Sequence, residues 1–290
     1  MGLWGYTGEN FLIMQAKISP VFLIFERQHH EAKTLFLALG KQIKSKKAIE
    51  LLSKLEFMEL FADMLAKIHF EKENYGKSLF SPFKNLKRSL RIIQHLKLVE
   101  KTTLDRVSTL DVQLASFSEY LSAQKRKGQK EAFELVTGST LKIWDDFLEN
   151  THQSSKGIKP LMIRTAINQL VEEELEFLQK DLKIPFSTQT FPELFESLRK
   201  IIMLENLLVH LGFNPIFVPQ IHQEIQQLKE NLKPWYSNHL ALQALAAFLS
   251  QKENPSKKYL DWAKDLKTEK KSLSSQIERQ AVDLLQKITL

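Results

Sequence analysis

Apolar residues recur at helical spacing along most of the chain, and this periodicity constrains the fold more than any other feature of the sequence. The stretch SPFKNLKRSLRIIQHLK (81–97), wound as a helix, places on one side the residues Phe83, Leu86, Leu90 and Ile93. Gly and Pro, which interrupt helices, are scarce, with nine of each in 290 residues. No run alternates apolar and polar residues between turn pairs such as Asn-Gly, as half-buried strands do. The sequence therefore predicts an all-α fold.

Proline and glycine mark where the predicted helices start and stop. Ser19-Pro20 is typical of an N-cap and first helical position, and Gly40 stops that helix. The stretch NTHQSSKGIKP (150–160) is polar and contains Gly and Pro, as linkers do. We predict an N-terminal tail (1–18), a first helical bundle (19–150), a linker (151–159) and a second helical bundle (160–290). The expected helical segments are about 20–39, 45–70, 82–99, 108–124, 129–149, 160–181, 191–210, 219–232, 235–250, 256–266 and 273–288.

The two halves contain similar segments, ELLSKLEFMELFADML (50–65) and ESLRKIIMLENLLVHL (196–211). Their identical pairs, each 146 positions apart, include Glu50/Glu196, Leu52/Leu198, Lys54/Lys200 and Glu59/Glu205. The order of helices around them also matches, which favours a duplicated unit over chance similarity between periodic helices. We therefore expect two pseudo-repeated antiparallel four-helix-like bundles with extra C-terminal helices.

These segments, extended to 46–65 and 191–211, resemble the two basic helices of the CHAD family, the conserved-histidine α-helical domain. Leu198-Arg199-Lys200 stands where the family has Leu-Arg-Lys, and IHQEIQQLKENL (221–232) resembles a later long helix of the family. The resemblance covers roughly residues 20–250. It implies two four-helix-like halves related by pseudo-symmetry and a cationic groove that binds inorganic polyphosphate.

The resemblance implies that three cations line this groove. Arg199 and Lys200 stand at basic positions of the family, and Lys54 corresponds to Lys200 in the internal repeat. Glu50 and Glu196 stand where the family has its signature histidines. The inner basic positions of both helices are also replaced, by Ser53, Phe57, Leu60, Met203 and Asn206. These replacements motivate a second hypothesis, in which the chain is a protein-interaction scaffold that has lost the ancestral ligand.

The positive charge of the protein is concentrated in one stretch. The net charge is +7, and residues 41–101 hold 14 Lys and Arg against 7 Asp and Glu, so the rest of the chain sums to zero. Within this stretch, the helix predicted over 82–97 presents a basic stripe made of Lys84, Lys87, Arg88 and Arg91. A localised excess of this kind attracts phosphate-rich partners.

The stripe has two interpretations. No acidic residue falls between Lys77 and Arg91, so ion pairs at i,i+4 within this helix cannot neutralise it. It is then either a polyanion site or a solvated helix face, the usual position of such runs. Arg164, Arg199 and Lys200 lie among apolar helix neighbours, where the acidic cluster EEELE (172–176) and Glu205 are available as ion-pair partners.

Several classes of site are disfavoured by the sequence. The chain has no Cys, which excludes disulfides, thiolate metal sites and Cys nucleophiles and suits a reducing cytoplasm. No Gly-x-Ser-x-Gly or Gly-rich phosphate loop occurs. Glu26-x-x-His29 and Glu149-x-x-His152 match the spacing of di-metal helical bundles, which also need carboxylates from two other helices. Glu26 lies near a helix start and His152 at the linker, so a di-metal enzyme ranks last, and no metal or cofactor is predicted.

We therefore predict a non-enzymatic protein that binds a phosphate-rich polyanion, with inorganic polyphosphate as the leading ligand. The predicted contacts are Lys84, Lys87, Arg88, Arg91, Lys54, Arg199 and Lys200. The alternative is a helical protein-interaction scaffold with an exposed apolar patch or a self-association surface. We expect a cytoplasmic protein, because the chain has no Cys and its apolar runs, such as VFLIF (21–25), are too short to span a bilayer.

Overall fold

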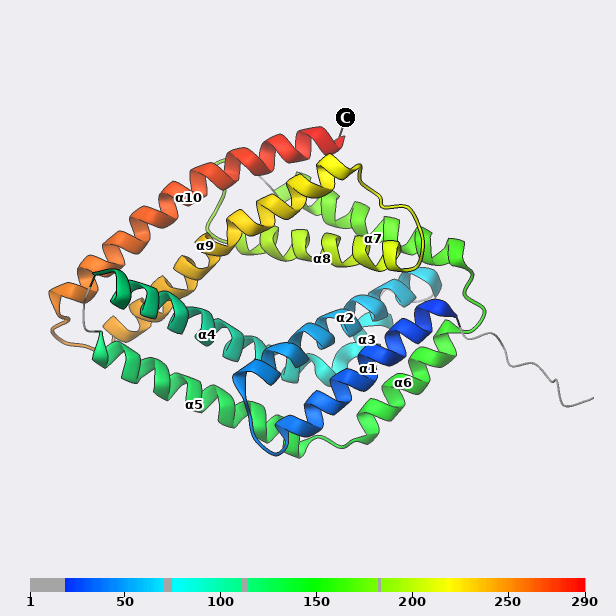
Figure 1. Ribbon diagram of the computed structural model, residues 1–290, viewed down its shortest axis with the longest axis horizontal. Coiled ribbons are helices and arrows are strands. Elements are labelled where there is room, and N and C mark those ends of the chain that lie inside the picture. The colour runs from blue at the N-terminus through cyan, green and yellow to red at the C-terminus, as the bar shows by residue number, and fades with distance from the viewer. Residues whose placement is uncertain (1–18, 70–74, 111–113, 182–183, 290) are drawn as a thin grey trace, which may run out of the picture.

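The structure, a computed structural model, describes residues 19–69, 75–110, 114–181 and 184–289, and this part of the chain contains helices and no strands. The predicted N-terminal tail lies outside the described residues. Figure 1 shows long helices wrapped around a central gap. In chain order they are α1 (Pro20–Leu39), α2 (Ser45–His69), α3 (Tyr75–Phe80), the short 3₁₀ helix η1 (Ser81–Phe83), α4 (Lys84–Leu110), α5 (Ala115–Gly138), α6 (Lys142–Ser155), α7 (Pro160–Asp181), α8 (Thr190–His210), α9 (Pro219–Leu249) and α10 (Lys257–Thr289). The prediction of an all-α fold is confirmed.

Helix starts marked by proline are placed as predicted. Helices α1, α7 and α9 begin at Pro20, Pro160 and Pro219. Proline suits the first helical position because the backbone N–H that it lacks has no partner inside the helix there. Gly212, which follows α8, has a φ of 84°, a left-handed conformation that glycine adopts without strain.

Several predicted breaks within the second half are absent. Helix α9 continues through Pro234, and α10 runs without interruption through residues 266–273, where a gap was expected. In α9, Leu228, Leu232 and Trp235 are all buried, so the apolar stripe stays on one face across the proline. Burial of one continuous face stabilises the long helix more than local breaking signals destabilise it.

The first half also differs in its helix limits. Helix α4 extends to Leu110, α5 includes residues 125–128, and α6 continues to Ser155. The predicted linker over 151–159 is therefore helical in its first five residues, and the chain turns at Gly157, which has a φ of 73°. The domain boundary itself remains a prediction.

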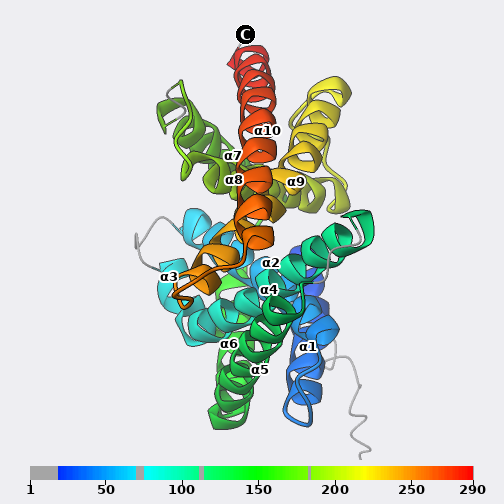
Figure 2. The same ribbon diagram turned by 90° about the vertical axis from the view of Figure 1, so that its left-hand side faces the viewer.

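Two buried apolar clusters hold the helices together. The larger contains Phe25, Phe61 and Trp144 from the first half together with Ile201 and Trp235 from the second. The smaller joins α4 and α5 to α9 and α10 through a set that includes Phe117, Phe248 and Trp262. Both clusters thus draw residues from each side of the predicted linker, and α9 packs against α4 (Figure 2). None of the described helices is both long and apolar enough to cross a membrane.

Candidate functional site

The predicted basic stripe on α4 is divided between two environments. Lys84 and Arg88 are exposed, whereas Lys87 and Arg91 are half-buried and face other helices. Lys87 donates to Glu59 of α2, and Arg91 donates to carboxylates of α2 and α8. The acidic partners that are missing within α4 are therefore supplied by neighbouring helices.

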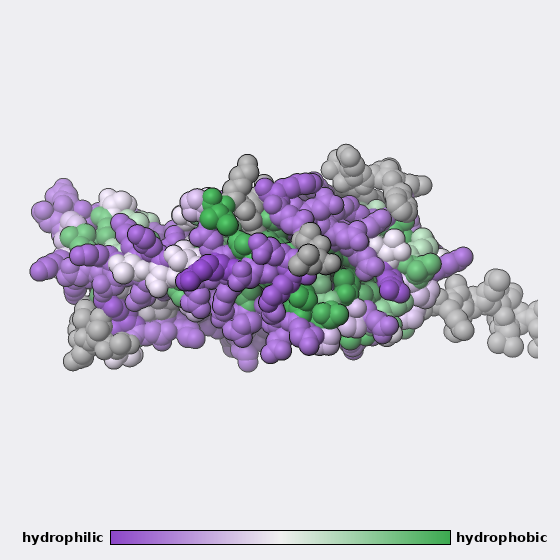
Figure 3. Space-filling view, turned by 90° about the horizontal axis from the view of Figure 1, so that it is seen from above, coloured by the Kyte–Doolittle hydropathy of each residue, from purple (hydrophilic) through white to green (hydrophobic). Residues whose placement is uncertain are grey.

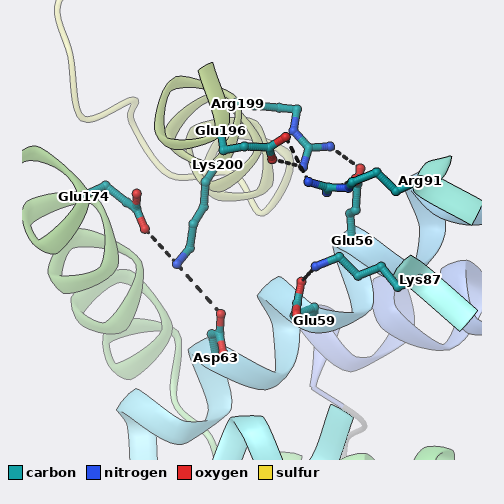
Figure 4. A network of polar contacts seen from close by, with 9 residues as sticks. All are labelled: Glu56, Glu59, Asp63, Lys87, Arg91, Glu174, Glu196, Arg199 and Lys200. Carbon is teal, nitrogen blue, oxygen red and sulfur yellow. Dashed lines mark hydrogen bonds and ion pairs between the residues drawn. The ribbon is translucent and has the colours of Figure 1, made fainter. Parts of the chain in front are cut away.

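A charge cleft, defined here by the nine residues drawn in Figure 4, lies where α2, α4, α7 and α8 meet. Helix α2 contributes Glu56, Glu59 and Asp63, whose spacing of three and four residues places them on one helix face. Cations come from α4 and α8, and α7 and α8 add further carboxylates. The nine residues are Glu56, Glu59, Asp63, Lys87, Arg91, Glu174, Glu196, Arg199 and Lys200.

At one end of the charge cleft, two arginines and two glutamates form a closed ring. Arg91 Nη2 lies 2.8 Å from Glu56 Oε1, and Arg91 Nη1 lies 3.0 Å from Glu196 Oε1. Arg199 donates to the second oxygen of Glu56 and, over 2.5 Å, to Glu196 Oε2. Each carboxylate thus pairs with both arginines. The side chain of Glu56 is only 8% exposed, and a carboxylate at that depth requires such partners to remain charged.

At the other end, Lys200 lies between two carboxylates. Its Nζ is 2.9 Å from Glu174 Oε1 and 3.8 Å from Asp63 Oδ2. The predicted pairing of Lys200 with the acidic cluster 172–176 is confirmed. Arg199 does not use Glu205, as that prediction allowed; Glu205 instead contacts His222 and the backbone N–H of Phe217.

The pKa values of these groups follow from burial and pairing. Burial acts to lower the pKa of Arg199, but Glu196 and Glu56 raise it overall. Burial likewise acts to lower the pKa of Lys200, and Glu174 reverses the effect. Burial raises the pKa of Asp63, and the nearby Glu59 adds to this, against the opposing effect of Lys200. The two cations are therefore charged at neutral pH, while Asp63 is the carboxyl in the cleft that protonates more readily than usual.

The charge cleft is large enough for a ligand, but its charges do not attract an anion. It encloses about 330 Å³. Its five carboxylates outnumber its four cations, so its formal charge is −1. A polyanion would have to displace carboxylates that already occupy the cationic groups. The arrangement is thus a set of ion pairs that joins helices, with no excess positive charge to attract phosphate.

The other predicted contacts lie outside the charge cleft. Lys54 pairs with Glu31 and donates to Gln28 Oε1 over 2.7 Å, both on α1. Lys84 and Arg88 are exposed, and Arg164 is exposed on α7. Of the seven predicted contacts, the fold brings four together: Lys87, Arg91, Arg199 and Lys200.

The carboxylates of α2 are the residues that sequence reasoning missed. Their spacing was visible in the sequence, because Glu56, Glu59 and Asp63 repeat at helical intervals. The i,i+4 rule concerns ion pairs within one helix, whereas these carboxylates lie on a helix more than 20 residues before the stripe. Periodicity shows that these acids share a face but not which helix that face meets.

The di-metal alternative has no support in the described residues. His29 is buried among aromatic rings, and its Nε2 donates to the backbone carbonyl of Trp144 over 2.9 Å. Burial lowers its pKa, so it is a neutral core histidine. No group of three or more His, Asp or Glu side chains within the described ranges is placed to hold a metal ion.

Comparison with known proteins does not assign the chain to a family. No protein-family model and no curated protein matches the chain.

Proposed function

We propose that this chain is a non-enzymatic helical protein-interaction scaffold whose charge cleft joins its helices instead of holding a polyanion. One observation carries the proposal. The four predicted cations that converge in the charge cleft, Lys87, Arg91, Arg199 and Lys200, each pair with a carboxylate of the chain itself. Their partners come from three helices, so the ion pairs tie α2, α4, α7 and α8 together.

The surface supplies apolar positions for a protein partner. Leu161 at the start of α7 and Val209 at the end of α8 are 69% and 49% exposed. Figure 1 places these two helix ends on the same side of the molecule, and Figure 3 shows apolar areas among hydrophilic ones on one face. A contiguous apolar patch around these helix ends would suit a protein partner better than a phosphate chain.

Polyphosphate binding is the second candidate function, and a specific observation favours it. The fold brings cations from α4 and α8, more than 100 residues apart in the sequence, to one cleft, and two of them, Arg199 and Lys200, hold positions that the CHAD resemblance assigns to the groove. Lys84 and Arg88 add two exposed cations on α4. Binding would require the polyanion to replace the carboxylates of α2 in these ion pairs.

The internal repeat gains support from one recurrent contact. Lys54 of α2 contacts Gln28 of α1, and Lys200 of α8 contacts Glu174 of α7. Residues 174 and 200 lie 146 positions after residues 28 and 54, the same offset as in the sequence repeat. This recurrence supports the proposal that the α1–α2 and α7–α8 hairpins are duplicates, within the two-bundle arrangement implied by the CHAD resemblance.

The two functions are separated by fluorescence anisotropy with labelled long-chain polyphosphate across a salt series. The scaffold proposal predicts no saturable binding by the wild type even at low salt. It also predicts that Glu59→Gln/Asp63→Asn, which changes the formal charge of the cleft from −1 to +1, creates salt-sensitive binding. Wild-type binding that Lys84→Glu/Arg88→Glu abolishes would overturn the scaffold proposal. Lys44→Glu/Lys47→Glu, at two exposed positions near the start of α2, is the matched charge control.

Sedimentation velocity over a concentration series tests the scaffold directly. The scaffold proposal is supported if the protein self-associates and salt does not weaken this association, because apolar contacts are not screened by ions. Leu161→Glu/Val209→Glu should then weaken the association. A monomer at every concentration, together with wild-type binding of polyphosphate, would establish the second candidate in its place.

A further inference from the structure

A second, larger cleft shares a wall with the charge cleft. It encloses about 690 Å³ and lies between α4, α8, α9 and α10. Glu196 and Arg199 of α8 line both clefts. This volume is within the range of about 300–1,000 Å³ that small-molecule sites occupy. We call it the aromatic cleft.

One wall of the aromatic cleft is apolar and fixed in position. Phe195 of α8 stacks on Tyr236 of α9 with ring centroids 5.1 Å apart and an interplanar angle of 15°. The Tyr236 hydroxyl is hydrogen-bonded to His95 Nε2 over 3.0 Å. Burial and the charge of Arg91 lower the pKa of His95 to about 4, so this bond joins two neutral groups at neutral pH. Leu98, Trp262 and Leu266 extend the apolar wall.

The carboxylates of the aromatic cleft are already engaged. Glu196 pairs with two arginines, and Glu269 accepts a hydrogen bond from Asn238 over 3.1 Å. Asp105 is the third carboxyl residue of the lining, and it is not without an interaction partner. Among the lining residues alone, these three carboxylates face four cations, a formal charge of +1, and Arg106 and Lys233 also pair with Asp265 and Glu230 outside the lining. The cations are Lys101, Arg106, Arg199 and Lys233.

Donor groups, in contrast, remain available. Within the described part of the chain, Lys101 makes no hydrogen bond or ion pair, and its side chain is exposed at the cleft. Gln94 and Ser237 line the same cleft, and their side chains likewise have no hydrogen-bond partner among the described residues. An ammonium, an amide and a hydroxyl are thus placed to donate to a ligand that brings its own acceptors.

We infer that the aromatic cleft binds a small amphiphilic anion, with an apolar body against the Phe195–Tyr236 wall and an acidic head near Lys101. A cationic ligand would meet carboxylates that already have partners, next to a free ammonium. An inorganic polyanion would leave the aromatic wall unused. The carboxylate, sulfonate or phosphate of an amphiphile satisfies the free donors while its apolar part is removed from water.

The test is a fluorescence titration of the full chain with 8-anilinonaphthalene-1-sulfonate, which carries an aromatic body and one anionic head. We expect one saturable site. Lys101→Glu should raise the Kd about fivefold by removing an attraction and adding a repulsion. The matched control is Lys97→Glu, one turn earlier on α4, at an exposed position that does not line the cleft. It should change the Kd less than about twofold. Ser237→Trp should raise the Kd about tenfold or more by filling the cleft.

Competition identifies the ligand class. Displacement by 2-naphthoate or decanoate, but not by tripolyphosphate, supports an amphiphilic anion, and the relative potency of the two acids distinguishes a ring system from an acyl chain. Equal effects of Lys101→Glu and Lys97→Glu, absence of a saturable site, or displacement by tripolyphosphate as effective as that by 2-naphthoate would each overturn the inference. These outcomes are independent of the proposed scaffold function, because the polyphosphate assay addresses Lys84, Arg88 and the charge cleft instead.

Discussion

The charge cleft and the aromatic cleft share Glu196 and Arg199 but differ in how their charges are compensated. In the charge cleft the cations have carboxylate partners, and the formal charge is −1. In the aromatic cleft Lys101 has no partner among the described residues, and the formal charge is +1. The comparison shows that a basic helix does not make a basic site. What faces each cation across the helix interface decides whether it remains available for a ligand.

The difference originates in the helices opposite α4. Near its start, α4 meets α2, whose polar face carries Glu56 and Glu59. Further along, α4 faces α9 and α10, which contribute Tyr236 and Trp262 to the cleft. The same helix therefore takes part in an ion-pair network at one end and in an amphipathic cavity at the other.

The largest expected effect comes from removing the central carboxylate of the charge cleft. Glu56→Gln should lower the free energy of unfolding by about 3 kcal/mol, because Arg91 and Arg199 lose a buried partner and repel each other. Urea denaturation measures this loss. The control is Glu50→Gln, at an exposed position of the same helix, which should stay within about 0.5 kcal/mol of the wild type. Equal losses in the two variants would show that the ring does not stabilise the fold.

A second loss of stability, of similar size, depends on pH and on His95, the hydrogen-bond partner of Tyr236. Burial lowers its pKa to about 4 from 6.5, so the unfolded chain takes up a proton first as the pH falls. The contribution of His95 to stability is complete above pH 6.5 and is lost as the pH falls towards 4, by on the order of 3 kcal/mol.

His95→Gln removes this titration and should flatten the fall in the free energy of unfolding between pH 6.5 and 4. His30→Gln, at an exposed histidine of α1, is the matched control for the loss of an imidazole. Parallel profiles for wild type and His95→Gln would contradict the assignment of His95 as a buried neutral group.

Removing the charge of Asp63 should change the free energy of unfolding by a smaller amount, and in the opposite direction: it should stabilise the fold. Its pKa is raised by burial, so the folded protein binds the proton more readily than the unfolded chain does, and this carboxyl favours folding more as the pH falls. Asp63→Asn should therefore increase the free energy of unfolding at pH 7.5, with a gain that disappears as the pH falls through the raised pKa. Lys200 keeps Glu174 as its partner in this variant. A constant difference across pH would refute the prediction, and Asp146→Asn, at an exposed position, is the matched control.

The smallest change in the free energy of unfolding is expected for a substitution in the aromatic cleft. Lys101→Glu should change the free energy of unfolding by less than about 0.5 kcal/mol, because Lys101 is exposed and has no partner among the described residues. Thermal unfolding followed by circular dichroism measures it. A loss comparable to that of Glu56→Gln would mean that Lys101 also belongs to a stabilising network, and the contrast between the clefts would fail.

Much of the fold follows from local patterns in the sequence. The periodicity of Phe83, Leu86, Leu90 and Ile93 places these residues in the core, where all four are buried. Proline positions give the starts of α1, α7 and α9. The breaks expected near Pro234 and over 266–273 were wrong, because a continuous buried face outweighs local signals that disfavour a helix.

The candidate site was less accessible to sequence reasoning. Four of the seven predicted cations follow from charge and spacing within one helix, and the other three follow from the resemblance to the CHAD family. Of all seven, four meet in the charge cleft, but the residues that neutralise them are far away in the chain. Arg91 and Glu196 are 105 positions apart, and Arg199 and Glu56 are 143 apart.

Local patterns were enough to predict that the chain is helical, where several helices begin and which face of α4 is apolar, because these depend on interactions between residues a few positions apart. The pairing of the cations of α4 and α8, and the cleft in which an ammonium stays unpaired, follow from how distant helices pack against each other. The energy of a charge depends on the groups within a few ångströms of it, and those groups come from helices that the periodicity of one segment cannot identify.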